Sequence, residues 1–347
     1  FISALGQVGY RGEAMASNWI AGRAFSHFYN LHSDAQIGLV DRHNYYGGGE
    51  GGTIQTQSML VAPGSGLLST GLSQVAGQPF SLSEWIHVFP TEWGVEGPAI
   101  LGAYGMGLQG WDVSFIFQNR DSGTWSERIG RDQWDATAPQ ILGVFPAVAR
   151  QVLRGDVKTS PVTHARKVHI PSLAKGELGF DDRADAQGDV KTSDSRTFPA
   201  AGLAMVRSMV EFTDKPEPTA SFDVRPFYKD GRVVSSTGEL RWGYGEGKGW
   251  IEIDTAGTQA VVGFAAGREI RLGDVSITPR TPFCAVYVSA RGKDESLPGA
   301  KSALITAVAR ARNSGMKVLG PLLLDAGKPP VVLEPVVAEV DLRRPGA

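Results

Sequence analysis

Three short apolar runs of the sequence stand next to side chains that can do chemistry. Residues 37–40 lead into Asp41-Arg-His-Asn-Tyr-Tyr46, and residues 79–83 lead into Glu84 and Trp85. A third run, residues 110–117, carries Trp111 near its start. A carboxylate, an imidazole and phenols are the groups that enzymes use to transfer protons or to attack a substrate. The sequence therefore marks these three positions as candidates for one catalytic site.

Helix-like stretches separate these runs, and they indicate how the runs are positioned. The apolar spacing predicts helices over residues 13–29, 66–75, 97–106 and 132–153, the last one kinked at Pro146. Strands that alternate with helices form parallel βα units, in which the carboxyl ends of the strands meet at one edge. The chain intervals between the candidate residues, about 40 and about 27 residues, fit one βα unit each.

The pattern of apolar residues in the sequence changes near residue 157. Short runs rich in valine and isoleucine follow at close spacing, separated by glycine and proline turns, and this pattern is typical of an antiparallel β-sandwich. The expected strands are residues 250–254, 259–264, 269–272, 274–277, 285–289, 303–308 and 331–334.

The motifs at the first three runs resemble those of a known group. Asp41 to Tyr46, Ser83-Glu84-Trp85 and Gln109-Gly-Trp111-Asp112 look like strands six, seven and eight of clan A retaining glycoside hydrolases. Residues 258–264 and 302–316 resemble the β-sandwich found beside such barrels. The resemblance implies an α/β fold followed by an all-β one: residues 1–156 as the C-terminal portion of a (β/α)8 TIM barrel, and residues 157–347 as an antiparallel β-sandwich domain.

The resemblance also implies roles for individual residues. Glu84 is expected to be the nucleophile, with a hydroxyl of Tyr45 or Tyr46 keeping it ionised and His43 bonding sugar hydroxyls or the carboxylate network. Five of the eight tryptophans lie between residues 85 and 134, and flat indole faces pack well against the C–H faces of sugars. The residues expected to bind substrate are Asn44, Trp85, Trp93, Trp111, Asp112 and Gln118.

The second carboxyl group of such an enzyme has no evident place in the chain. The clan carries its general acid/base on strand four as an Asn-Glu pair, and this dipeptide does not occur here. We expect the acid/base to lie on a preceding segment, and Glu50 and Glu92 are the alternatives on this chain. Two other classes stay open: a noncatalytic carbohydrate-binding protein with an incomplete barrel, and a structural sandwich that the first half only supports.

Composition excludes several other functions. The net charge of −2 and the pI near 6.4 argue against nucleic acid as a partner, and no apolar run reaches the roughly 18 residues of a membrane span. Cys284 is the only cysteine. The G-x-G-x-x-G match at residues 105–110 precedes a strand instead of following one, so no dinucleotide is expected. We expect a carbohydrate substrate, no cofactor, no metal, a secreted or periplasmic location in a bacterium, and either a missing N-terminal segment or a homo-oligomer.

Overall fold

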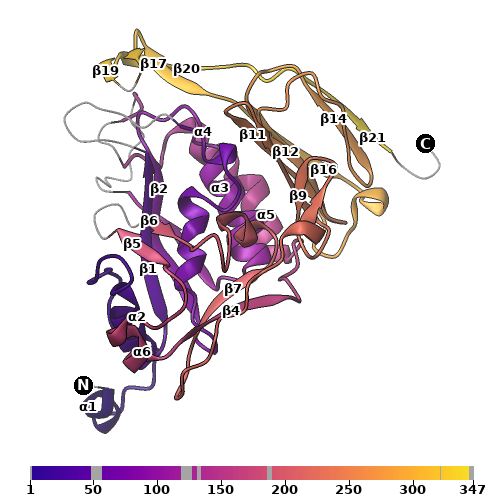
Figure 1. Ribbon diagram of the computed structural model, residues 1–347. Helices are drawn as coiled ribbons and strands as arrows, with labels where there is room; N and C mark the ends of the chain where they lie inside the picture. The colour runs from indigo at the N-terminus through magenta and orange to yellow at the C-terminus, as the bar shows by residue number, and fades with distance from the viewer. Residues whose placement is uncertain are drawn as a thin grey trace.

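The computed structural model describes residues 2–47, 57–118, 127–130, 134–185, 190–320 and 322–343. Helix makes up 22% and strand 34% of the described residues, so the fold is mixed, and these residues form several sheets but no closed barrel. A small parallel sheet, a layer of helices and a large antiparallel sheet follow one another across the molecule (Figure 1). A smaller antiparallel sheet covers part of the outer side of the large one.

The parallel sheet contains the three apolar runs. Its strands are β1 (Val40–Gly47), β2 (Phe80–Val88) and β3 (Val113–Ile116), in the order β1-β2-β3. Between β1 and β2 runs the 3₁₀-helix η3 (Gly66–Ser73), and between β2 and β3 the helix α3 (Glu96–Ile100) continues as the π-helix η4 (Leu101–Leu108). The expected parallel βα units are present. β1 and β2 start and end later than expected, so residues 41–46 and Glu84 lie within strands, whereas β3 is shorter than expected at both ends.

The helix expected over residues 13–29 was a wrong prediction. The helices in this part of the chain are α1 (Ile2–Gln7) and α2 (His27–Ala35). Between them, polar side chains take over backbone hydrogen bonds: Trp19 donates its N–H to the hydroxyl of Ser17, and Arg23 donates to that of Ser26. Such local bonds compete with helix formation, and the left-handed conformation of Ala24, with φ of 49°, also interrupts a helix.

The helix expected over residues 132–153 is shorter and divided. It consists of α4 (Pro139–Leu142) and α5 (Phe145–Arg154), and each has a proline in its first turn, where no backbone N–H is needed. The chain leaves α5 through Gly155, which adopts the left-handed conformation with φ of 63°. Pro146 thus begins a helix instead of kinking one.

The segment after residue 157 does not go directly into antiparallel sheets. The strands β4 (Thr163–Val168) and β7 (Arg207–Phe212) form a parallel pair, and a bridge between Val75 and Val210 connects them to the first half. Between them lie short elements: α6 (Ile170–Lys175), β5 (Arg183–Asp185), β6 (Val190–Thr192) and η5 (Ala200–Ala204). We expected a sandwich starting at residue 157. Apart from the short antiparallel pair β5–β6, the antiparallel sheets begin only near residue 228, later than expected.

The expected antiparallel sheets follow. The large sheet has seven strands in the order β16-β15-β12-β11-β10-β9-β8. They are β8 (Tyr228–Lys229), β9 (Arg232–Val234), β10 (Leu240–Gly245), β11 (Lys248–Asp254), β12 (Thr258–Gly263), β15 (Cys284–Ala290) and β16 (Ala303–Val308). The smaller sheet contains β13 (Ile270–Arg271), β14 (Val275–Pro279) and β21 (Ala338–Leu342). Two hairpin-like pairs complete the chain: β17 (Ala311–Ser314) with β20 (Lys328–Leu333), and β18 (Lys317–Leu319) with β19 (Leu322–Asp325).

One large apolar core joins the two halves. It extends from Phe28 on α2 through Phe80 on β2 and Tyr104 on η4 to Trp242 and Tyr287 of the seven-stranded sheet. The helical layer therefore packs against the parallel sheet on one side and the antiparallel sheet on the other (Figure 1). The helices cover one face of the parallel sheet. A ligand site on this sheet can therefore lie on its other face, away from α3 and η4.

Candidate active site

An irregularity in β2 decides which side chains reach that face. The pairing with β1 slips between Arg42 and His43, so that Ser83 is an extra residue in β2. Such a bulge redirects the side chains that follow it. Phe80 and Leu82 before it lie in the core with the helices, and strict alternation would send Glu84 there too. After the bulge Glu84 instead occupies the opposite face.

Glu84 lies there between two side chains of the neighbouring strand. The hydroxyl of Tyr45 donates a hydrogen bond to Oε2 of Glu84, and Nδ1 of His43 lies 3.3 Å from the same oxygen. The Glu84 side chain is 31% exposed, whereas His43 is 2% exposed. Among the described residues Oε1 of Glu84 has no hydrogen-bond partner. One oxygen is therefore oriented by the protein, and the other is available to a ligand.

Asp41, on the same face, holds the bulge in place. One of its oxygens accepts the backbone N–H of Ser83 at 3.0 Å, and the other accepts the Ser83 hydroxyl. Asp41 is fully buried, and its carboxylate lies 4.0 Å from Nε2 of His43. Neither nitrogen of His43 makes a hydrogen bond to a described residue, so its contacts with the two carboxylates are close approaches only. The burial of His43 favours the carboxylate network over direct contact with a sugar.

Aromatic rings surround this group. Trp19 is 65% exposed, and its ring centroid lies 5.6 Å from that of His43. Phe117 and Trp134 pack against Tyr45 with centroid distances of 5.8 and 6.3 Å. The sequence did not indicate Trp19 as a neighbour of this site, and it did not decide whether Trp134 lies in the core or at the site. Trp19 was assigned to a helix that does not form, and no short-range pattern connects it to β1.

Three other expected site residues face the helices instead. Asn44 and Tyr46 alternate with His43 and Tyr45 along β1, and Trp85 follows Glu84 on β2. Asn44 donates hydrogen bonds to Thr70 Oγ1 and to backbone carbonyls of η3, so it fastens that helix. Desolvation by burial, with Glu96 nearby, raises the pKa of Tyr46 to about 12. Alternation along a strand places these side chains away from Glu84.

The remaining candidate residues pack against, or hydrogen-bond to, other parts of the protein. Trp111 precedes β3, is 3% exposed and packs against Phe80 at the far end of the sheet, so it does not share a cleft with Glu84. Asp112 accepts the backbone N–H of Phe80 at 2.9 Å. Trp93 packs against Phe264 and Phe283 of the antiparallel half. Gln118 accepts the backbone N–H of Ala136 and supports the loop beside Trp134.

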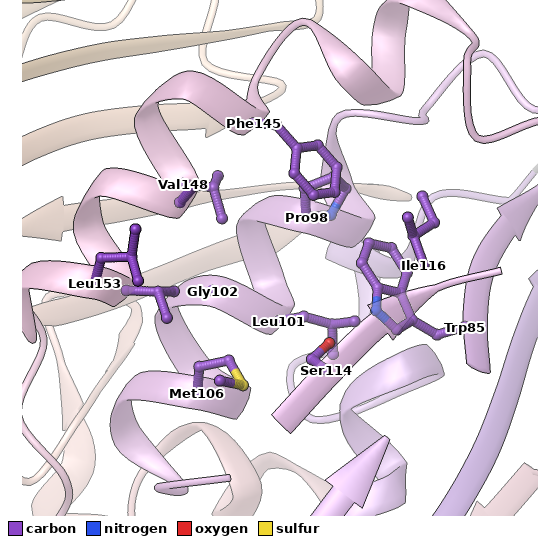
Figure 2. Close-up of a pocket in the computed structure, with 12 residues that line it drawn as sticks. Trp85, Pro98, Leu101, Gly102, Met106, Ser114, Ile116, Phe145, Val148 and Leu153 are labelled. Atoms are coloured by element: carbon purple, nitrogen blue, oxygen red, sulfur yellow. The ribbon is translucent and has the colours of Figure 1, made fainter. Parts of the chain in front are cut away.

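Trp85 lines a groove on the helical side that is unsuited to sugars. The groove lies between β3, η4 and α5, and its lining is almost entirely apolar (Figure 2). Ser114 is the one hydroxyl-bearing side chain in that lining. A sugar-binding site needs several polar groups to hydrogen-bond the sugar hydroxyls. The face of the parallel sheet that carries Glu84 is therefore a better candidate for a sugar site than this groove.

Glu92 and Glu96 bind other groups of the protein, away from Glu84. Glu92 forms an ion pair with Arg312 and lies 3.9 Å from Arg310, which connects the first half to β17. Glu96 is fully buried and accepts hydrogen bonds from the Ser58 hydroxyl and the Met59 N–H. Burial raises the pKa of Glu96 to about 8. Glu50 lies outside the described residues.

The described residues contain no group of three or more histidine, cysteine, aspartate or glutamate side chains arranged to hold a metal ion. Within the same residues, no helix combines the length and apolar character needed to cross a membrane. Comparisons of the chain with protein-family models, with curated proteins and with solved structures give no match. The geometry around Glu84 is therefore the basis for assigning a function.

Proposed function

We propose that this protein is a retaining glycoside hydrolase that cleaves a β-linked polysaccharide or oligosaccharide, with Glu84 as its nucleophile. The observation that supports this best is the arrangement of Glu84. Its carboxylate is partly exposed on the face away from the helices, Tyr45 donates to one oxygen, and the other oxygen has no described partner. A nucleophile needs one carboxylate that stays ionised and correctly oriented.

The reaction takes place in two displacements. Oε1 of Glu84 attacks the anomeric carbon as the bond to the leaving oxygen breaks, and a second carboxyl group roughly 5–5.5 Å away gives that oxygen its proton. Water then attacks the same carbon, loses its proton to the second carboxylate, and releases Glu84. Asp41 is not suited to be this acid, because it is fully buried and accepts two hydrogen bonds from Ser83.

We further propose that β1, β2 and β3 are the last three strands of a (β/α)8 barrel. Their parallel order and helical connections support this, and so does the position of Glu84 on the face away from the helices. Among the described residues β3 has a strand partner only on its β2 side, and the groove of Figure 2 lies beside it. Further barrel strands would pair at this edge.

The test uses reagents whose leaving group needs no acid. A panel of 2-deoxy-2-fluoro-β-glycosyl fluorides is incubated with the whole chain, and peptides are analysed by mass spectrometry. Fluoride leaves without protonation, and the fluorine at C2 slows hydrolysis of the ester. We expect one sugar of the panel to remain attached to Glu84. The Glu84→Gln variant should form no adduct, and the matched variant Glu177→Gln, at an exposed position, should be labelled like wild type.

Turnover gives a second readout. On any substrate that the protein hydrolyses, Glu84→Gln should lose nearly all activity with the fold intact, because an amide cannot attack the anomeric carbon. A residual rate of about one tenth, equivalent to ~1.4 kcal/mol in the barrier, would rule out Glu84 as nucleophile. If sugars bind but no reagent labels Glu84, the protein is the noncatalytic carbohydrate-binding alternative.

A further inference from the structure

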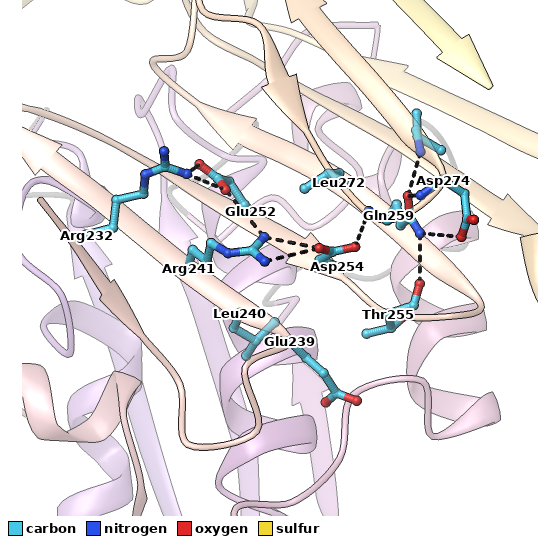
Figure 3. Close-up of polar contacts among 12 residues, drawn as sticks. Arg232, Glu239, Leu240, Arg241, Glu252, Asp254, Thr255, Gln259, Leu272 and Asp274 are labelled. Carbon is cyan, nitrogen blue, oxygen red and sulfur yellow. Dashed lines mark hydrogen bonds and ion pairs between the residues drawn. The ribbon is translucent and has the colours of Figure 1, made fainter. Parts of the chain in front are cut away.

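The seven-stranded sheet has an outer face that is only partly covered. Val261, Val286 and Val288 on β12 and β15 point outward and pack under the three-stranded sheet. The outward residues of β9 and β10 lie beyond that cover. Those of β11 lie at its edge, where Asp254 accepts the backbone N–H of Gly273 and Trp250 packs against the cluster under the three-stranded sheet. The outward residues of these three strands include Arg232, Arg241, Glu252 and Asp254, and Figure 3 shows the ion pairs that join them. An aromatic residue, Trp250, lies among these charges on the same face.

The Trp250 side chain is fixed from three directions. Its ring lies over Gly243 on the paired strand, where an added Cβ would come within 2.2 Å of the indole. Its Nε1 donates to Glu252 at 2.9 Å, and Glu252 also accepts two hydrogen bonds from Arg232. The Arg268 guanidinium lies 4.3 Å from the ring centroid on the Trp250 ring face. The Trp250 indole and the Arg268 guanidinium over it together form one side of a surface hollow.

This hollow, of about 630 Å³, lies at the tip of the β10–β11 hairpin. Tyr244, 39% exposed, also lines the hollow, and its side chain is hydrogen-bonded to Tyr228. Glu246, Lys248 and Arg268 contribute one negative and two positive charges. Within the described part of the chain, none of these three forms an ion pair or a side-chain hydrogen bond. The hollow therefore combines an apolar surface with available donors and acceptors.

We propose that this hollow binds a short stretch of an uncharged polysaccharide chain. The Tyr244 ring offers a surface for the C–H face of a sugar. Lys248 and Arg268 supply donors to hydroxyls, and Glu246 supplies an acceptor. The choice of ligand class depends on the proposed glycoside hydrolase function, and the hollow would hold the polymer that Glu84 cleaves.

The test measures retention of the whole chain by neutral polysaccharides, using affinity electrophoresis in gels that contain β-glucan, galactan, xylan or mannan. We expect at least one polymer to slow the wild-type protein. Tyr244→Ala and Arg268→Ala should each weaken this retention by about tenfold, the effect of losing ~1.4 kcal/mol of binding. Tyr29→Ala, which removes a similarly exposed tyrosine from α2, serves as the control and should be retained like wild type.

Separate variants distinguish this inference from the proposed function. Glu84→Gln should be retained normally, and Tyr244→Ala should still be labelled at Glu84 by the fluorinated reagent. Retention that depends on Tyr244 without any labelling of Glu84 would support the hollow and refute the hydrolase. The inference is wrong if no neutral polymer retains the protein, if only dextran sulfate or DNA does, or if retention is lost in Trp19→Ala and unchanged in Tyr244→Ala.

Discussion

The two oxygens of Glu84 have different surroundings, and this difference is chemically useful. Oε2 accepts the Tyr45 hydroxyl and lies near His43, while Oε1 is left for a ligand. A hydrogen bond to an ionised group is shorter and stronger than one between neutral groups. If Glu84 is the nucleophile as proposed, Tyr45 is expected to act as a positioning residue that orients the Glu84 carboxylate through this hydrogen bond.

Replacing Tyr45 by Phe tests this role. The phenyl ring keeps the contacts with Phe117 and Trp134, so stability should change little. Loss of a hydrogen bond to a charged group costs about 1.5–3 kcal/mol, so kcat should fall by roughly 10- to 100-fold while KM changes less. Steady-state kinetics on an aryl glycoside that the protein accepts measures both constants. Tyr46→Phe, one residue further on the opposite face, is the matched control and should keep its kcat; equal losses in the two variants would contradict the assignment.

At the scale of the element, the extra residue Ser83 determines where Glu84 points. Ser83 and Glu84 together oppose His43, and Asp41 accepts two hydrogen bonds from Ser83 across the strand pair. Bulges often redirect side chains next to active sites. Asp41 thereby acts on Glu84 through the backbone of β2.

The Asp41→Ala variant should show this coupling. It leaves the half-buried Ser83 N–H and hydroxyl without an acceptor, so we expect the protein to lose about 2 kcal/mol of unfolding free energy and the rate of Glu84 labelling to fall. Ser83→Ala removes one hydroxyl and should cost about 1 kcal/mol. Urea denaturation measures the stabilities. If Asp41→Ala lowers stability and leaves the labelling rate unchanged, the bonds to Ser83 support the sheet without positioning Glu84.

Much of the parallel half could be predicted from the sequence, and the failures have physical causes. The order of apolar runs and helical stretches correctly predicted the strands β1 and β2 and their parallel pairing. Alternation along β1 was present in the sequence and would have separated Asn44 and Tyr46 from His43 and Tyr45. The bulge at Ser83 was not visible, because it depends on pairing with Asp41, a residue 42 positions earlier. Long-range pairing of this kind leaves no local pattern.

At the scale of the whole molecule, several ionisable groups lie in the shared core and couple its stability to pH. Burial lowers the pKa of His27 to about 4 and of His87 to about 3, and it also lowers the pKa of His164. Burial raises the pKa of Glu96 to about 8. The histidines and Glu96 thus bind protons differently in the folded and unfolded chains, and they act over different pH ranges.

The stability of the protein should be greatest near pH 6.5 and should decline on both sides. Below the ordinary histidine pKa of 6.5 the unfolded chain takes up protons that folded His27, His87 and His164 do not, so acid favours unfolding. Glu96 acts in the opposite direction. Its carboxyl loses its proton near pH 4.5 when unfolded and near pH 8 when folded, so it reduces stability as pH rises through that interval.

Above pH 6.5 the three histidines no longer oppose this loss, and the slope should approach ~1.4 kcal/mol per pH unit. Urea denaturation at about pH 5, 6.5 and 8 measures the profile. Glu96→Gln resembles the protonated side chain, since its amide can donate to Ser58 Oγ while its carbonyl accepts the Met59 N–H. This variant should therefore keep its stability between pH 6.5 and 8, where the wild type loses it. An equal decline in both proteins would show that Glu96 is ionised in the folded state or that another group controls the alkaline side.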